Sequence, residues 1–275
     1  MKDPIQTSGP SSRESRTPER TEKDTRRPAL SVVVLCYRSE ERIIPYLQQM
    51  EKELSAEGVT DEELVLVGNY VRGSGDRTPD VIRKLAEKNP KIVPVTLEKQ
   101  GMMGWDVMTG LAAARGEAVA LIDGDGQMPS SDITRLYRVL RSGEVDFAKT
   151  FRVKRFDGTS RRVVSRCYNV IFHLLFPGTP FRDINSKPKL IARRALEQMH
   201  LTCKGWFSDG EIMLEVRRLN LSFADVPTVF HENEWRASFV SAWTALEILG
   251  YMLLYRLKYW FGRRPQTNGP GTSTS

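Results

Sequence analysis

Short apolar runs alternate with helix-patterned segments over the first half of this 275-residue chain. Four runs resemble strands: residues 30–37 (LSVVVLCY), 62–69 (EELVLVGN), 91–97 (KIVPVTL) and 117–123 (EAVALID). Residues 40–54, 76–89 and 102–116 lie between them and have helical spacing. Continuous β-branched runs are typical of strands buried on both faces. The alternation predicts an α/β fold that is Rossmann-like and doubly wound, with a mostly parallel sheet.

The two ends of the chain differ in composition from the middle. Residues 1–28 mix both signs of charge with Ser, Thr and Pro, and residues 263–275 are equally poor in apolar side chains. Such segments bury too little apolar surface to offset the entropy lost on ordering, so both are predicted to be disordered. The folded part is predicted to be one domain over residues 29–236 and an amphipathic C-terminal helix over residues 237–262.

Charge and cysteine content limit the classes of partner and compartment. The formal net charge of +7 favours anionic partners such as a phosphate-bearing substrate or an acidic membrane surface. Nucleic acid is not expected, because acidic residues interleave with the basic ones in the N-terminal segment. The three cysteines are far apart and follow no paired spacing, which suits a reducing cytosol. With no apolar N-terminal signal, a cytoplasmic location is predicted.

Two carboxylates stand where the fourth predicted strand ends. The stretch ALIDGDGQMP places Asp123 and Asp125 one residue apart, with Gln127 following. Ligands of doubly wound sheets bind beyond the carboxyl ends of the strands, and hard oxygen ligands suit Mg²⁺ or Mn²⁺ bridging to a diphosphate. We therefore predict a metal site formed by Asp123, Asp125 and Gln127. A solvated turn with incidental acids is the alternative for this short motif.

Five blocks in the chain resemble glycosyltransferase family 2 in their order and spacing. They are VVVLCYRSEERI, GSGDRTPDVI, KQGMMGWDVMTGLAAARGE, ALIDGDGQMPSSDI and RDINSKPKLIARRAL, and the resemblance extends from about Leu30 to Val240. Within the family, the chain is most similar to the branch that includes dolichol-phosphate mannose synthases and other polyprenyl-phosphate sugar transferases. The resemblance implies a GT-A fold, with a nucleotide-binding half followed by a half that shapes the acceptor site.

The resemblance also assigns roles to individual residues of this chain. It implies donor contacts from Tyr37, Glu40, Asn69, Asp76, Asp123 and Arg152, and acceptor contacts from Arg162, Ser165, Asp183 and Ser186. It implies catalytic roles for Asp125, for the late arginine Arg236, and for Asp209 and Glu211 as candidate bases. Asn69 and Tyr70 depart from the family pattern, which has paired aspartates there, so the base of a UDP- or GDP-linked sugar stays open.

The arginines that follow the predicted fifth strand have a physical interpretation of their own. Arg152, Arg155, Arg161 and Arg162 lie within a short stretch, and guanidinium groups pair with phosphate oxygens in a bidentate fork. A solvated basic face is the alternative. Lys187 and Lys189, in NSKPKL, either extend this basic funnel or are simply exposed.

Three functions are compatible with these features. The preferred one is metal-dependent, inverting sugar transfer from a nucleotide sugar to a polyprenyl phosphate, a lipid-phosphate acceptor that needs no general base. Transfer to a hydroxyl group is the second, and it would need Asp209 or Glu211 as base, although both also suit the acidic first turn of a helix. The third is a non-catalytic module that binds nucleotide sugars.

The C-terminal helix has two interpretations. Its apolar residues are interrupted by Glu247 and Arg256, so no run is long enough to span a bilayer. Aromatic and basic side chains near its end suit the interface of an anionic membrane, which would make the protein peripheral on the cytoplasmic face. Packing on the α/β body, or in the seam of a homodimer, is the alternative.

Overall fold

The structure, a computed structural model, describes residues 26–156, 158–232 and 242–261. Most of both predicted disordered tails, residues 1–28 and 263–275, therefore lies outside the described residues. Arg26 and Pro28, at the end of the first tail, are described: Arg26 lies 3.6 Å from Asp61, and the carbonyl of Pro28 accepts a hydrogen bond from the Glu117 amide. The first strand, Leu30–Leu35, begins directly after this segment.

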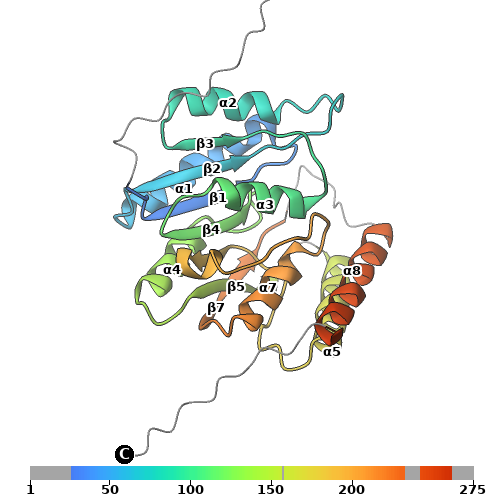
Figure 1. Cartoon of the computed structure of the whole chain (residues 1–275). Coiled ribbons are helices and arrows are strands. Elements are labelled where there is room, and N and C mark those ends of the chain that lie inside the picture. The colour runs from blue at the N-terminus through green and yellow to red at the C-terminus, as the bar shows by residue number, and fades with distance from the viewer. Residues whose placement is uncertain (1–25, 157, 233–241, 262–275) are drawn as a thin grey trace, which may run out of the picture.

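One seven-stranded sheet forms the centre of the molecule, in the order β3-β2-β1-β4-β6-β5-β7 (Figure 1). The strands are β1 Leu30–Leu35, β2 Glu62–Val67, β3 Ile92–Val95, β4 Ala118–Asp123, β5 Phe147–Arg155, β6 Lys189–Ala192 and β7 Phe223–Phe230. Neighbouring pairs are parallel except those of β6, which runs antiparallel to both β4 and β5. The predicted doubly wound, mostly parallel α/β sheet is confirmed.

Helices cover the sheet. They are α1 Ile43–Ala56, α2 Thr78–Lys88, α3 Met103–Ala113, α4 Ser131–Arg141, α5 Thr159–Leu175, α6 Arg193–Leu196, α7 Ser208–Arg218 and α8 Ala242–Phe261, with a 3-10 turn, η2, at Glu40–Arg42. α3 packs beside α7, and α1 packs beside α4. Figure 1 shows α3 and α7 on the side of the sheet toward the viewer and α1 behind it. Because helices lie on both faces, every residue of β1 and β2 is buried.

The parallel register of β1 and β4 fixes the position of the site. Leu35, the last residue of β1, pairs with Asp123, the last residue of β4. The chain then turns at Gly124, where an added Cβ would lie 2.7 Å from the Ile43 side chain and 3.0 Å from the Leu35 carbonyl oxygen, so a larger residue would require its neighbours to shift. Asp123 and Asp125 therefore stand at the carboxyl edge of the sheet, where the sequence predicts a ligand site.

The C-terminal helix α8 packs on the body next to α5 (Figure 1). Met252 is buried, the Tyr255 ring lies 5.2 Å from that of Phe207, and the Tyr255 hydroxyl donates to Glu211. The described helix, residues 242–261, lies within the range 237–262 expected from the sequence. The side of the helix that carries Met252 and Tyr255 packs against the body. Within the described part of the chain, no helix is both long enough and apolar enough to cross a membrane.

Candidate active site

The end of β4 and the loop after it carry Asp123 and Asp125, and hydrogen bonds of Gln127 hold the loop. The Asp125 side chain accepts a hydrogen bond from the Gln127 amide at 3.1 Å, and the Gln127 side-chain nitrogen donates to the His231 carbonyl at 2.9 Å. Gln127 is buried, whereas 35 % of the Asp123 side chain is exposed. Gln127 thus ties the loop to the end of β7. In residues 26–156, 158–232 and 242–261 no three His, Cys, Asp or Glu side chains form a metal site.

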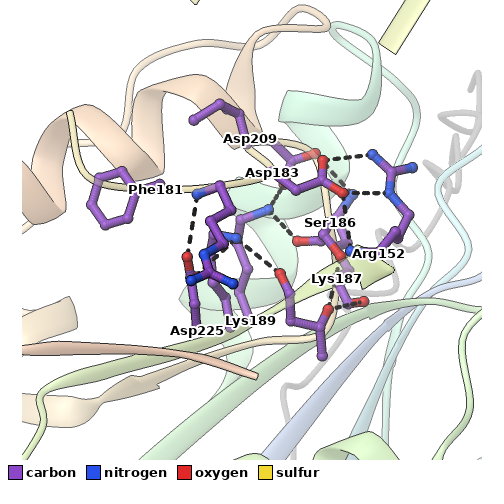
Figure 2. A network of polar contacts seen from close by, with 12 residues as sticks. Arg152, Phe181, Asp183, Ser186, Lys187, Lys189, Asp209 and Asp225 are labelled. Atoms are coloured by element: carbon purple, nitrogen blue, oxygen red, sulfur yellow. Dashed lines mark hydrogen bonds and ion pairs between the residues drawn. The ribbon is translucent and has the colours of Figure 1, made fainter. Parts of the chain in front are cut away.

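Two buried lysines, Lys187 and Lys189, contact Asp209 (Figure 2), and Lys187 also contacts Asp123. The Lys187 Nζ is 3.3 Å from Asp123 and 3.0 Å from Asp209, and the Lys189 Nζ is 2.5 Å from the other Asp209 oxygen. Burial alone would raise the pKa of Asp209, but the two lysines outweigh it and hold the pKa below its usual value. Burial lowers the pKa of Lys189 to about 8, against the opposite pull of Asp209. Both lysines are buried, so they are not simply exposed, and neither lines the arginine-rich pocket between β5 and α5, so they do not extend a basic funnel there.

The two acids predicted as candidate bases are both held by other groups. Asp209 gives one carboxylate oxygen to each lysine. Glu211 is buried too, and it accepts hydrogen bonds from the backbone amides of Thr202 and Cys203 and from the Tyr255 hydroxyl. Both carboxylates, in the first turn of α7, are therefore used in contacts within the protein. The sequence offered them as candidate bases for a hydroxyl acceptor, and in the structure both are buried.

Arg152 and Asp183 meet face to face. The guanidinium donates through Nε and Nη2 to the two Asp183 oxygens, at 2.7 Å each. Burial opposes ionisation of Asp183, yet Arg152 and the nearby Lys149 lower the pKa of this carboxyl to about 2. Ser186 is also buried, 2.9 Å from the Thr150 hydroxyl. Arg152 was predicted to contact the donor, and Asp183 and Ser186 the acceptor. The structure pairs Arg152 with Asp183, both in the wall of one pocket, and pairs Ser186 with Thr150.

An arginine-rich pocket of about 660 Å³ opens between β5 and α5. Its wall includes Arg152, Arg155, Arg162, Ser165, Arg166 and Arg182. The predicted acceptor residues Arg162 and Ser165 thus lie in one pocket, and Arg162 donates to the Thr159 hydroxyl at 2.9 Å. Sequence reasoning missed Arg166 and Arg182. Arg166 lies one turn of α5 beyond Arg162, on the same side of the helix, which is a signal that the sequence contained.

A smaller cavity of about 210 Å³ lies at the carboxyl ends of β1 and β4. It is lined by Tyr37, Lys99, Met102, Asp106, Asp123 and Trp206, among others. The predicted donor residues Tyr37 and Asp123 therefore face the same cavity. The Lys99 Nζ sits 4.4 Å from the centre of the Tyr37 ring and forms an ion pair with Asp106. Lys99 was not singled out from the sequence.

Three other predicted donor residues make contacts within the protein. Asn69 is wholly buried: its side-chain nitrogen donates to Asp106 and Thr109, and its oxygen accepts from the Leu97 amide. It is placed to join β2 to α3 and not to contact a base. Asp76 accepts from the amide and hydroxyl of Thr78 at the start of α2.

Glu40, the third of these residues, lies close to the start of α2. Its amide donates to the same Thr78 hydroxyl, and its carboxylate is 3.4 Å from Arg77. Neither Glu40 nor Asp76 lines the small cavity. Arg236, the predicted late arginine, lies outside the described residues.

The chain is similar to known glycosyltransferases. The chain is 22 % identical to a dolichyl-phosphate beta-glucosyltransferase of Trichomonas vaginalis, covering 84 % of this chain and 75 % of that protein. It is 29 % identical to an undecaprenyl-phosphate 4-deoxy-4-formamido-L-arabinose transferase of Edwardsiella ictaluri, covering 51 % of this chain and 42 % of the other.

A solved structure shares the fold. Glucosyl-3-phosphoglycerate synthase of Mycobacterium tuberculosis, in complex with Mn²⁺, UDP and phosphoglyceric acid, superimposes with a TM-score of 0.64 at 20 % identity, covering 83 % of this chain and 78 % of that one. The GT-A-type architecture expected from the sequence is confirmed by this likeness. The family model described as glycosyl transferase family 2 matches residues 31–205. The chain therefore belongs to glycosyltransferase family 2.

Proposed function

We propose that this protein transfers a sugar from a nucleoside-diphosphate sugar to a polyprenyl phosphate, with inversion at the anomeric carbon and with Mg²⁺ or Mn²⁺ as cofactor. The observation that carries the acceptor class is the arginine-rich pocket of about 660 Å³. A guanidinium group can donate two parallel hydrogen bonds to a phosphate. The wall of the pocket contains Arg152 and four further arginines. The names of the relatives above, which include dolichyl- and undecaprenyl-phosphate transferases, support the same class.

The donor would bind in the smaller cavity, with its diphosphate toward Asp123 and Asp125. Two carboxylates fit a Mg²⁺ or Mn²⁺ site in which substrate phosphates and water complete the coordination, as is usual for Mg²⁺. When bound, the metal supplies positive charge that stabilises the departing nucleoside diphosphate. Asp123 and Asp125 would hold it, and the hydrogen bonds of Gln127 join Asp125 to the chain that follows β7.

The placement of the acids favours a phosphate acceptor over a hydroxyl. A hydroxyl acceptor needs a base, but both Asp209 and Glu211 are buried and hydrogen-bonded. A phosphate monoester is ionised near neutral pH and attacks without one. Direct attack from the face opposite the leaving group gives inversion. The third function, a module that only binds nucleotide sugars, is disfavoured because the carboxylate pair is intact.

Replacing Arg162 by alanine tests the acceptor assignment. Loss of one charge-assisted hydrogen bond costs about 1.5–3 kcal/mol, so the apparent affinity for a polyprenyl phosphate should fall roughly ten- to a hundredfold. Hydrolysis of the nucleotide sugar without acceptor should stay at the wild-type rate. Arg138→Ala, an exposed arginine of α4 paired with Glu57, is the control. Unchanged use of the lipid phosphate by Arg162→Ala, or efficient transfer to free polyprenol, would contradict the proposal.

An apolar surface beside the pocket suits a membrane-embedded acceptor. α5 exposes Val163, Val164, Val170, Ile171 and Leu174, and α8 exposes Leu246, Leu253, Leu254 and Leu257. α5 contains no acidic residue but carries Arg161, Arg162 and Arg166. Such a mixture of apolar and basic side chains favours an anionic lipid surface. We propose that this surface, formed by α5 and α8, rests on the cytoplasmic face of a membrane.

Vesicle sedimentation checks the membrane surface. The double variant Leu174→Asp with Leu254→Asp changes two side chains that are 74 % and 54 % exposed, so folding should be preserved while binding to anionic vesicles falls at least about tenfold. Val71→Asp changes a 49 % exposed valine that follows β2, a strand separated from β5 in the sheet by β1, β4 and β6, and it should bind like the wild type. Equal pelleting of the double variant and the wild type, or a dimer in light scattering that the double variant dissociates, would assign this surface to a protein contact.

A further inference from the structure

Lys187 occupies a position that neither the carboxylate loop nor the arginine pocket explains. Only 3 % of its side chain is exposed, and its Nζ lies between Asp123, at 3.3 Å, and Asp209, at 3.0 Å. It is therefore a buried cation aimed at the carboxylate that closes β4. We propose that Lys187 is a positioning residue and a resident positive charge of the donor site: it orients Asp123 and attracts the donor diphosphate. This inference rests on the proposed function.

The partition of contacts between the two lysines supports this role. Lys189 alone satisfies one Asp209 oxygen at 2.5 Å and also donates to the Ser186 carbonyl at 2.8 Å. Lys187 is the one that reaches Asp123. If Lys187 served only to neutralise Asp209, Lys189 would already do so. The four charges of Asp123, Lys187, Asp209 and Lys189 sum to zero, so the contact between Lys187 and Asp123 completes the balance.

Electrostatics gives this role a signature that a structural role lacks. A fixed positive charge close to Asp123 repels a divalent cation arriving alone and attracts a diphosphate. Removing the charge should therefore strengthen the binding of bare metal and weaken the binding of metal-free diphosphate. A lysine that only supports folding would, when removed, weaken both. The two measurements thus move in opposite directions only if Lys187 acts on the site.

The variant Lys187→Met keeps the length of the side chain and removes its charge. Mn²⁺ binding, measured as the electron paramagnetic resonance signal of free Mn²⁺, should tighten about three- to tenfold. Inorganic pyrophosphate binding in the presence of EDTA, measured by titration calorimetry, should weaken by a similar factor. Lys187→Gln, which retains a donor for Asp209, should give the same two shifts and covers the case in which the methionine variant does not fold.

Lys149→Met is the matched control, because Lys149 is equally buried but pairs with Asp225 at 3.1 Å and makes no contact with Asp123. It should leave both affinities at the wild-type value. Weaker Mn²⁺ binding by the Lys187 variants, or equal shifts in the Lys149 variant, would overturn the inference. Neither probe contains a sugar or a lipid, so a wrong assignment of the acceptor would appear in the Arg162 assay and leave these two affinities unaffected.

Discussion

Sugar transfer by the Asp125→Asn variant is expected to be at least about a hundredfold slower than by the wild type, because a neutral amide is a poor ligand for Mg²⁺ or Mn²⁺ and leaves the departing diphosphate without its counter-charge. The fold should survive, since Asp125 lies in the loop after β4 and outside the core. Release of nucleoside diphosphate with Mn²⁺ present, followed over time, gives the rate. Thermal unfolding confirms that the variant is folded.

A second aspartate-to-asparagine change separates a metal effect from a general loss of charge. Asp80→Asn removes an exposed carboxylate of α2 that pairs with Arg83, and its rate should equal that of the wild type. Wild-type turnover by Asp125→Asn in the presence of the metal would show that this loop does not hold the cofactor. The proposed acceptor pocket would be unaffected by that result.

The central sheet was predictable because its signal is local. β1 and β2 are continuous apolar runs, and each is buried along its whole length. The site loop was predictable for the same reason: a strand end, two carboxylates and two glycines stand within a few residues of one another. A mostly parallel sheet then brings the loops after β1 and β4 to one edge, which is why Tyr37 and Asp123 share a cavity.

Ion pairs formed by residues distant in sequence could not be predicted in this way. Arg152 and Asp183 are 31 residues apart, and nothing near either of them indicates the other. The lysine pair belongs to the same class. Lys187 precedes β6, which begins at Lys189, and the partner of both lysines, Asp209, lies 22 and 20 residues further along the chain. Nothing near NSKPKL indicates that carboxylate.

Asn69 shows how a departure from a family pattern can have a structural cause. The sequence suggested a base contact at this position, because an amide can both donate and accept. In the structure the Asn69 side-chain nitrogen donates to Asp106 and Thr109, and the side-chain oxygen accepts from the Leu97 amide. Both ends of the amide therefore have partners within the protein. The contact partners lie 28 to 40 residues away, so the composition near Asn69 carried no sign of them.

The buried lysine pair makes Asp209 the position where a single change should cost the most stability. Asp209→Asn removes the carboxylate that holds both Lys187 and Lys189. Lys187 then keeps Asp123 as an ionic partner, whereas Lys189 keeps the Ser186 carbonyl but loses its carboxylate. Breaking a buried pair by removing one partner typically costs 3–5 kcal/mol, so we expect the free energy of unfolding to fall by about that amount. Urea denaturation followed by circular dichroism measures it.

The same measurement on two further variants identifies the cause. Glu57→Gln breaks an exposed pair with Arg138 and should cost about 0–1 kcal/mol, as exposed ion pairs do. Adding Lys189→Met to Asp209→Asn removes one of the uncompensated charges, so the double variant should be more stable than Asp209→Asn alone, although Lys189→Met by itself is destabilising. Simple additivity of the two changes would mean that Asp209 contributes through packing. Recovery in the double variant would mean that charge balance around Asp209 is what α7 and β6 require in order to pack.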